Sequence, residues 1–187
     1  MTKYGVIVGS LRKNSYTQGV AKAIVAGLPK EDSVTWLDID LPLYDQDYDD
    51  VGPAPESYQT FRSQAKNQDA FILVTPEHNR NTSAALKNAL DVGSRPMDQT
   101  VWDGKPALVA SQSPSGIAGA LANHAVRHSL VFLNMPVLQQ PELYIGNSAD
   151  LADKNGNITN ADTQKFLADA AKKFVSFAKR FVSQQKV

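Results

Sequence analysis

The sequence predicts an α/β fold of three layers, with helices on both faces of a five-stranded parallel sheet. Short apolar segments alternate five times with longer segments of helical periodicity. The least interrupted apolar run, residues 69–75, is typical of a central parallel strand buried on both faces. Helices that separate successive strands are long enough to cross over, so the strands should run parallel, and the order 2-1-3-4-5 is the simplest for five of them.

Composition limits the number of domains and the classes of partner. The chain has 187 residues, 42% of them hydrophobic, which suits one domain over residues 1–187. Lys plus Arg equals Asp plus Glu at 19 each, so no basic surplus indicates a nucleic-acid partner. No apolar run approaches the roughly 18 residues that cross a bilayer. The chain has no cysteine, so redox chemistry requires a bound cofactor, and we expect a cytoplasmic protein without a membrane partner.

The first half of the chain begins with a short apolar strand from Lys3. The helical pattern over residues 15–28 ends where Pro29 follows. A second strand is expected at 34–39. The next segment, 41–50, is rich in acids with prolines nearby, which predicts an irregular, solvated loop rather than a cation site. A mostly polar helix then starts at Pro55 and continues through Asn67.

The second half repeats the alternation after the strand at 69–75. A helical pattern follows Ser83, a fourth strand is expected at 105–110, and a helix at 120–133 leads to a fifth strand around 136–140. Thr159 and Asp162 form a capping box for the last helix. That helix should bury an apolar face made of Phe166, Ala170, Phe174, Phe177 and Phe181.

The turn after the first strand predicts an anion site. Gly9, Ser10, Arg12 and Ser15 lie between a strand and a helix, where unpaired backbone N–H groups and the helix dipole favour a phosphate. Ser15 with Gln18 also fits a capping box that needs no ligand, and the local sequence leaves both interpretations open. The turn matches neither a Walker loop nor a dinucleotide fingerprint.

Two further loops favour the phosphate. Residues 75–83 follow the third strand, and the small-residue loop 111–119 follows the fourth. In a sheet of this order, ligands bind beyond the carboxyl ends of the strands where the winding direction reverses, and all three loops lie at that end.

His124 and His128 have the spacing of a metal pair but no third ligand, so we predict no metal site.

The chain resembles the NADPH-dependent FMN reductases, a family that includes quinone, chromate and azo-dye reductases. The resemblance is carried by the segments 9–15, 76–79, 86–91 with 94–96, 104–106 and 130–133. It implies a flavodoxin-like fold, FMN as cofactor, NADPH or NADH as co-substrate, and a homodimer or homotetramer. The implied activity is reduction of flavin, quinone, azo or similar small acceptors by hydride transfer through FMN N5, with no catalytic side chain.

The resemblance also implies site residues, position by position. Those expected to hold the phosphate and the nearby ribityl chain are Ser10, Arg12, Ser15, Tyr16 and Thr17. Those expected along the isoalloxazine, mostly through backbone groups, are Pro76, Glu77, His78 and Asn79. Ser113 is expected to close the site from the third loop.

The chain departs from the family pattern at several positions. Thr17 replaces the usual asparagine, and its hydroxyl is a shorter partner for the same phosphate. His78 replaces the usual tyrosine, so the flavin edge is more polar. Ser83 and Ala84 stand about where the family has proline and glycine, and residues 119–122 replace a glycine-rich, arginine-bearing stretch. We expect FMN binding to survive these changes.

Two other functions fit the same loops. A flavodoxin-type electron carrier would not oxidise a nicotinamide itself, but such carriers are typically strongly acidic and this chain has a formal net charge of +0. A binding module that has lost its flavin would keep the loop geometry without colour. The enzyme is the favoured prediction.

Overall fold

The computed structural model describes residues 1–182 and confirms the predicted sheet. Its five parallel strands lie in the order β2-β1-β3-β4-β5. In that order they are Ser33–Trp36, Lys3–Val8, Ala70–Pro76, Ala107–Gln112 and Leu143–Ile145. The winding direction reverses between β1 and β3, so a crevice opens at the carboxyl ends of these neighbouring strands.

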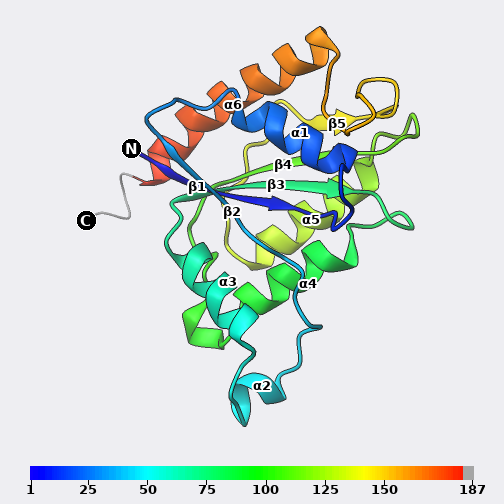
Figure 1. Ribbon diagram of the computed structural model, residues 1–187. Helices are drawn as coiled ribbons and strands as arrows, with labels where there is room; N and C mark the ends of the chain where they lie inside the picture. The colour runs from blue at the N-terminus through cyan, green and yellow to red at the C-terminus, as the bar shows by residue number, and fades with distance from the viewer. Residues whose placement is uncertain (183–187) are drawn as a thin grey trace.

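Helices cover both faces of the sheet (Figure 1). On one face lie α1 (Tyr16–Val25) and α6 (Ala161–Val182), and on the other lie α3 (Glu56–Lys66), α4 (Ala84–Gly93) and α5 (Ala120–Phe132). Two short helical segments lie in loops: α2 (Asp47–Asp50) precedes α3, and η1 (Met97–Gln99) follows α4.

The central strand β3 connects the two apolar cores, as its uninterrupted sequence predicts. Every residue of β3 is buried. Ile72 and Val74 face α1 and α6, whereas Phe71 and Leu73 face the other three helices. Alternate side chains of a strand point to opposite faces, so a strand covered on both sides is apolar throughout.

The fifth strand lies later in the chain than the predicted 136–140. Val137 makes only an isolated bridge with Ala107 at the start of β4. Pro141 follows and has no N–H to donate to a ladder. Regular pairing with β4 begins only at Leu143, so the prediction was wrong by several residues.

The acidic segment 41–50 is not wholly irregular or solvated, contrary to the prediction. Its end forms the short helix α2, which lies apart from the sheet at the bottom of Figure 1. Asp49 is nearly buried there in a two-pronged ion pair with Arg62 of α3, with N–O distances of 2.7 and 2.8 Å. The ion pair fastens this segment to the helical layer.

The last helix begins differently from the prediction. Asn160, not Thr159, supplies the cap, because its Oδ1 accepts the N–H of Thr163 at 2.9 Å. The buried face is also shifted, since Phe166 is 40% exposed while Leu167 is fully buried. Ala170 and Phe174 are buried as predicted, and Phe177 packs against the core as a partly buried residue.

Candidate functional site

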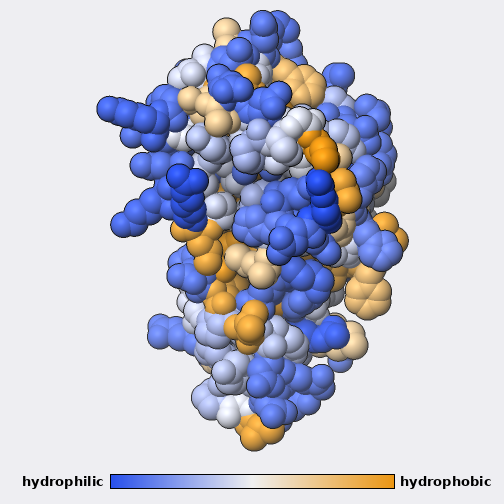
Figure 2. All heavy atoms as spheres, turned by 90° about the vertical axis from the view of Figure 1, so that its right-hand side faces the viewer, coloured by the Kyte–Doolittle hydropathy of each residue, from blue (hydrophilic) through white to orange (hydrophobic). Residues whose placement is uncertain are grey.

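The carboxyl ends of β1, β3 and β4 open into one cleft of about 580 Å³. Figure 2 views the molecule from this edge and shows a mainly polar surface interrupted by small apolar patches. The cleft is lined by residues of three loops and the helix starts that follow them: Gly9, Ser10, Leu11, Arg12, Ser15, Tyr16, Thr17, Pro76, Glu77, His78, Ser83, Ala84, Ala85, Gln112 and Pro114. Three segments far apart in the sequence therefore meet at the expected edge.

Eight of the ten predicted site residues line this cleft. The two that do not are Asn79, which faces a neighbouring cleft beside α4 and α5, and Ser113. Ser113 Oγ instead accepts the N–H of Ser115 at 3.1 Å and lies 3.0 Å from Ser115 Oγ, so this side chain shapes the loop. Its neighbours Gln112 and Pro114 line the cleft in its place.

The first loop combines a helix cap with unpaired N–H groups of Tyr16 and Thr17, which form a candidate anion cradle. Ser15 Oγ accepts the N–H of Gln18 at 3.1 Å, which is the first of the two bonds of the predicted capping box. The N–H groups of Tyr16 and Thr17, also in the first turn of α1, have no intrahelical partner. The cap therefore leaves two N–H donors for a ligand, and the two interpretations of this turn are compatible.

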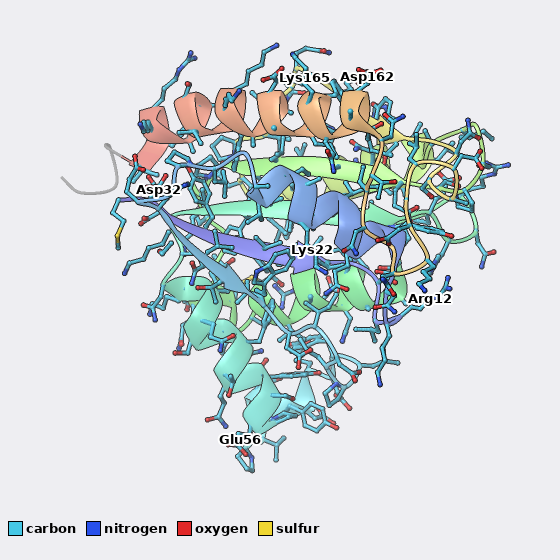
Figure 3. All side chains as sticks on the ribbon, turned by 45° about the horizontal axis from the view of Figure 1, so that its top comes forward. Arg12, Lys22, Asp32, Glu56, Asp162 and Lys165 are labelled. Carbon is cyan, nitrogen blue, oxygen red and sulfur yellow. The ribbon has the colours of Figure 1, made fainter. Side chains whose placement is uncertain are left out.

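Arg12 is the cation of this loop that lines the cleft. Its side chain is exposed, and its guanidinium makes no hydrogen bond or ion pair within residues 1–182. Figure 3 shows Arg12 at the end of the molecule beyond the strands, opposite Asp32. A guanidinium without a partner, next to free N–H groups at a helix start, suits a phosphate group.

Thr17 belongs to a buried chain of hydrogen bonds that orients its hydroxyl. Ser148 Oγ donates to Gln112 Oε1 at 2.8 Å, and Gln112 Nε2 donates to Thr17 Oγ1 at 2.9 Å. Because Thr17 Oγ1 already accepts a hydrogen bond from Gln112, the hydroxyl proton of Thr17 remains available to donate. No acceptor for this proton occurs within the described chain. The departure at position 17 therefore still supplies a donor next to the cradle.

Gln112 was missed as a site residue at the sequence level. The available signal was a polar residue directly after a mostly apolar strand segment, at the edge of the sheet where the other loops lie. Its partners, Thr17 and Ser148, are distant in the sequence and come together only through the pairing of β4 with its neighbours.

Replacing Gln112 by leucine is expected to weaken binding of FMN, the cofactor that the resemblance implies, roughly 3- to 10-fold, the size of one hydrogen bond. Without the Gln112 amide, the Thr17 hydroxyl is no longer held as a donor. Fluorescence titration of the apoprotein with FMN measures the change. Ser148→Ala, which removes only the outer bond of the chain, should have a smaller effect, and equal affinities in all three proteins would contradict the role given to Thr17.

The second loop is shaped by its own backbone and by Glu77. His78 and Asn81 exchange two backbone hydrogen bonds of 2.9 Å, and Asn79 and Arg80 between them have positive φ values of 49° and 63°. Glu77 Oε2 accepts the N–H groups of Leu121 and Ala122 at 3.2 and 3.3 Å. These bonds cap α5, whose own first position is Gly119 with no side chain. Glu77 therefore fixes the second loop to the start of α5.

A hairpin at 152–158 packs against the first loop and the start of α1. Its turn, which resembles a calcium loop in sequence, is organised by Asp153, whose Oδ1 accepts the N–H groups of Asn157 and Asn155. Those bonds, the one from Asn157 above all, hold the pKa of Asp153 below its ordinary value. Gly156 at the tip lies directly against Asn14 and against Gly19 of α1.

No group of three or more potential metal-binding side chains occurs in residues 1–182.

Substituting Gly19 by alanine is expected to destabilise the protein by about 1–3 kcal/mol. The added Cβ would collide with the backbone carbonyl of Gly156, which is not the movable end of a side chain. Chemical denaturation measures the loss. Gly116→Ala is the matched control, because nothing lies within 4 Å of a Cβ at that position; equal stabilities of the two variants would refute the tight contact.

The NADPH-dependent FMN reductase family model matches residues 2–150. The chain belongs to this family. A quinone reductase of Pseudomonas putida is 49% identical over 175 residues, which cover 93% of each chain. A 2-hydroxy-1,4-benzoquinone reductase of a Burkholderia species is 39% identical over 178 residues, covering 95% of this chain and 96% of the relative.

A solved structure agrees with this assignment. The flavoenzyme FerB of Paracoccus denitrificans, an NAD(P)H:acceptor oxidoreductase, superposes with a TM-score of 0.87 at 33% identity over 97% of this chain and 99% of its own. The flavodoxin-like fold is confirmed. The chain is an FMN-dependent NAD(P)H oxidoreductase of this family, which favours the enzyme over the flavodoxin-type carrier.

Proposed function

We propose that this chain reduces quinones with electrons from NADH or NADPH, at an FMN held in the 580 Å³ cleft. The observation that carries the proposal is the candidate cradle at the start of α1, where residues with free N–H groups, Thr17 and Arg12 line one cleft at the switch point of the sheet. The names of the Pseudomonas and Burkholderia relatives favour a quinone over an azo compound or free flavin as acceptor.

The residues of the cleft divide between the two ends of the cofactor. Ser10, Arg12, Ser15 and Thr17 would hold the phosphate, with Tyr16 beside the ribityl chain. The segment 76–79 would lie along the ring, Gln112 and Pro114 would bound it from the third loop, and Ser113 would keep that loop in shape. Gly9 matters to this fit because a Cβ there would stand 3.0 Å from Pro76 Cδ and from Ser83 Oγ, closing the gap between two loops.

FMN, when bound, supplies the hydride and electron chemistry, so the protein needs no nucleophile or general base of its own. The chain holds the phosphate at one end, fixes the second loop through the paired His78 and Asn81 backbones, and leaves His78 exposed at the rim. Rigid backbone on one side and an open cleft on the other allow two substrates to use one site in turn.

Purified protein should be yellow, and with FMN it should oxidise NADH or NADPH continuously when 1,4-benzoquinone is supplied. Absorbance spectra and steady-state rates test this. Colourless protein that fails to bind added FMN would contradict the flavin site. Flavin-loaded protein that oxidises no nicotinamide would support the carrier instead.

We further propose a single domain over residues 1–187, a cytoplasmic location, and assembly as a homodimer or homotetramer. No helix of the described chain is long and apolar enough to span a membrane. Assembly is supported by the outer face of α5, where Val131 and Phe132 are 78% and 79% exposed. Such large exposed apolar side chains on adjacent positions suit a protein interface.

Phe132→Glu is expected to lower the mass of the assembly, because a charge would have to be buried in the interface. Light scattering measures the mass. Val51→Glu is the matched control, since Val51 is 82% exposed at the distant α2 segment. An unchanged mass for Phe132→Glu would exclude this face of α5 from the interface.

A further inference from the structure

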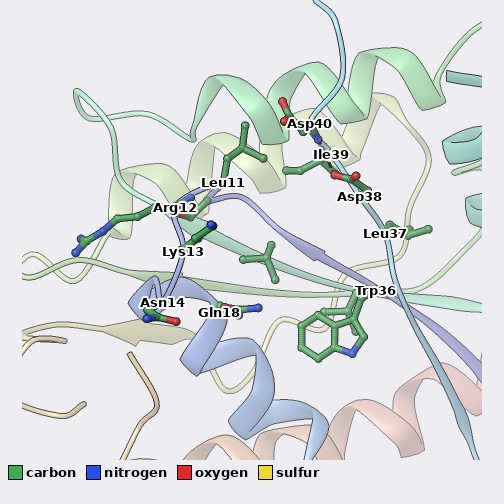
Figure 4. Close-up of a pocket in the computed structure, with 13 residues that line it drawn as sticks. Leu11, Arg12, Lys13, Asn14, Gln18, Trp36, Leu37, Asp38, Ile39 and Asp40 are labelled. Carbon is green, nitrogen blue, oxygen red and sulfur yellow. Dashed lines mark hydrogen bonds between the residues drawn. The ribbon is translucent and has the colours of Figure 1, made fainter. Parts of the chain in front are cut away.

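A second cleft, of about 620 Å³, lies on the other side of the first loop. Its walls come from β1, the start of α1 and the segment after β2, and it shares Ser10, Leu11 and Arg12 with the flavin cleft. The two clefts therefore adjoin across the tip of one loop. Figure 4 shows the side chains that line the second cleft.

Trp36 provides an aromatic wall of the second cleft. It is the last residue of the edge strand β2, and 43% of it is exposed. It belongs to neither apolar core and makes no ring contact within residues 1–182. An exposed indole in a cleft offers a stacking surface for a nucleobase.

Asp38 presents a carboxylate two residues further on. Its Oδ1 accepts the N–H of Asp40 at 3.0 Å, which fixes the side chain. Its Oδ2 accepts no hydrogen bond in the described part of the chain. A fixed carboxylate just after the second strand of an α/β sheet is suited to accept hydrogen bonds from the hydroxyls of an adenosine ribose.

The two cations of the loop differ in the clefts that they line, because Arg12 lines both and Lys13 lines only the second. In Figure 4 the side chain of Arg12 extends away from Trp36, whereas Gln18 of α1 lies on the Trp36 side. Lys13 also lines the second cleft but not the first, and its ammonium has no partner in residues 1–182. Arg12 is thus placed for the flavin phosphate, and Lys13 remains for a second phosphate-bearing ligand.

We propose that the second cleft binds the adenosine diphosphate half of the nicotinamide co-substrate. Adenine stacks on Trp36, the adjoining ribose hydroxyls donate to Asp38, and Lys13 pairs with the diphosphate. The nicotinamide half then reaches across the shared loop tip into the flavin cleft. This inference rests on the proposed function.

The same arrangement selects NADH over NADPH. NADPH carries a phosphate in place of the ribose 2′-hydroxyl, and that phosphate would lie beside the carboxylates of Asp38 and Asp40. The phosphate and the carboxylates are both negative and repel one another, and the 2′-hydroxyl that donates to Asp38 is lost. The acidic end of the second cleft therefore acts as a specificity determinant.

ADP-ribose, which contains this half but no nicotinamide, tests the site without any hydride transfer. Calorimetry with the FMN-loaded protein should show binding, and Trp36→Leu should weaken it roughly tenfold, the size of one base stacked on an aromatic ring. Phe166→Leu is the matched control, because Phe166 is 40% exposed on α6 outside the cleft. No binding, or equal binding by both variants, overturns the proposal.

Kinetics with three electron donors give the second test. Asp38→Asn should raise KM for NADH several-fold and lower KM for NADPH, while the rate with reduced nicotinamide mononucleotide, which lacks adenosine, should not change. Asp98→Asn, an exposed carboxylate on η1, is the control. An unchanged NADH to NADPH preference in Asp38→Asn overturns the specificity role. ADP-ribose binding without oxidation of any of the three donors would instead contradict the proposed function and leave the adenosine site standing.

Discussion

Arg12→Ala is expected to lower FMN affinity roughly 10- to 100-fold without changing the stability of the apoprotein. Hydrogen bonds from a guanidinium to a phosphate are charge-assisted, and they are about twice as strong as bonds between neutral groups. Arg12 is exposed and has no partner within residues 1–182, so its removal breaks no contact that supports the fold. Titration with FMN and thermal unfolding of the apoprotein measure the two quantities.

Two further variants test whether the donor geometry and the position of Arg12 matter as well as its charge. Arg12→Lys keeps the charge but loses the planar fork of donors, so its affinity should fall between those of the wild type and Arg12→Ala. Lys30→Ala removes an exposed cation far from the cleft and should leave FMN binding unchanged. If Arg12→Ala binds FMN as well as the wild type does, the turn is explained by the Ser15 cap alone.

The sequence predicts the fold well because the main signals are local. Alternation of strands and helices fixes a parallel sheet, and the apolar run at 69–75 marks its centre. The parallel arrangement then brings the three loops to one edge, so most of the candidate site follows from topology. The first loop shows this clearly, since the cap of α1 and the free N–H groups beside it both follow from the same few residues.

The errors arise where distant residues decide the structure. The buried partner of Asp49 is Arg62 on another helix, and no local pattern distinguishes this aspartate from its solvated neighbours. The role of Gln112 likewise depends on Thr17, which is 95 positions away. The fifth strand was misplaced because residues 136–140 resemble a strand, but Pro141 delays regular pairing until Leu143.

Breaking the ion pair between Asp49 and Arg62 should be the most destabilising single change outside the apolar core. Both side chains are nearly buried, with exposed fractions of 6% and 14%. Arg62 Nε also donates to the carbonyl of Val92 in α4, and the Tyr44 hydroxyl donates to Asp49 Oδ2. Asp49→Ala leaves the guanidinium buried without its counterion, which costs about 3–5 kcal/mol.

A double substitution separates the cost of an unpaired charge from the net value of the pair. Asp49→Leu together with Arg62→Met removes both charges and keeps apolar volume, so the double variant should be more stable than Asp49→Ala. Denaturant unfolding gives the free energies. Asp169→Asn is the control, because the pair of Asp169 with Lys165 lies on the surface and its removal should change the free energy of unfolding far less. A double variant as unstable as Asp49→Ala would mean that the charges themselves stabilise the fold.

The same pair predicts a loss of stability in acid. Hydrogen bonds from Arg62, opposed by partial burial, hold the pKa of Asp49 below the ordinary value of 3.8. A carboxyl with a lowered pKa in the folded state contributes its full stability above that ordinary value and loses the contribution as the pH falls below it, because the unfolded chain then binds the proton first. Asp49→Asn has no carboxyl to titrate at this position, so the difference in unfolding free energy between wild type and variant should shrink as the pH falls through this range. A difference that stays constant there would contradict the ionised pair.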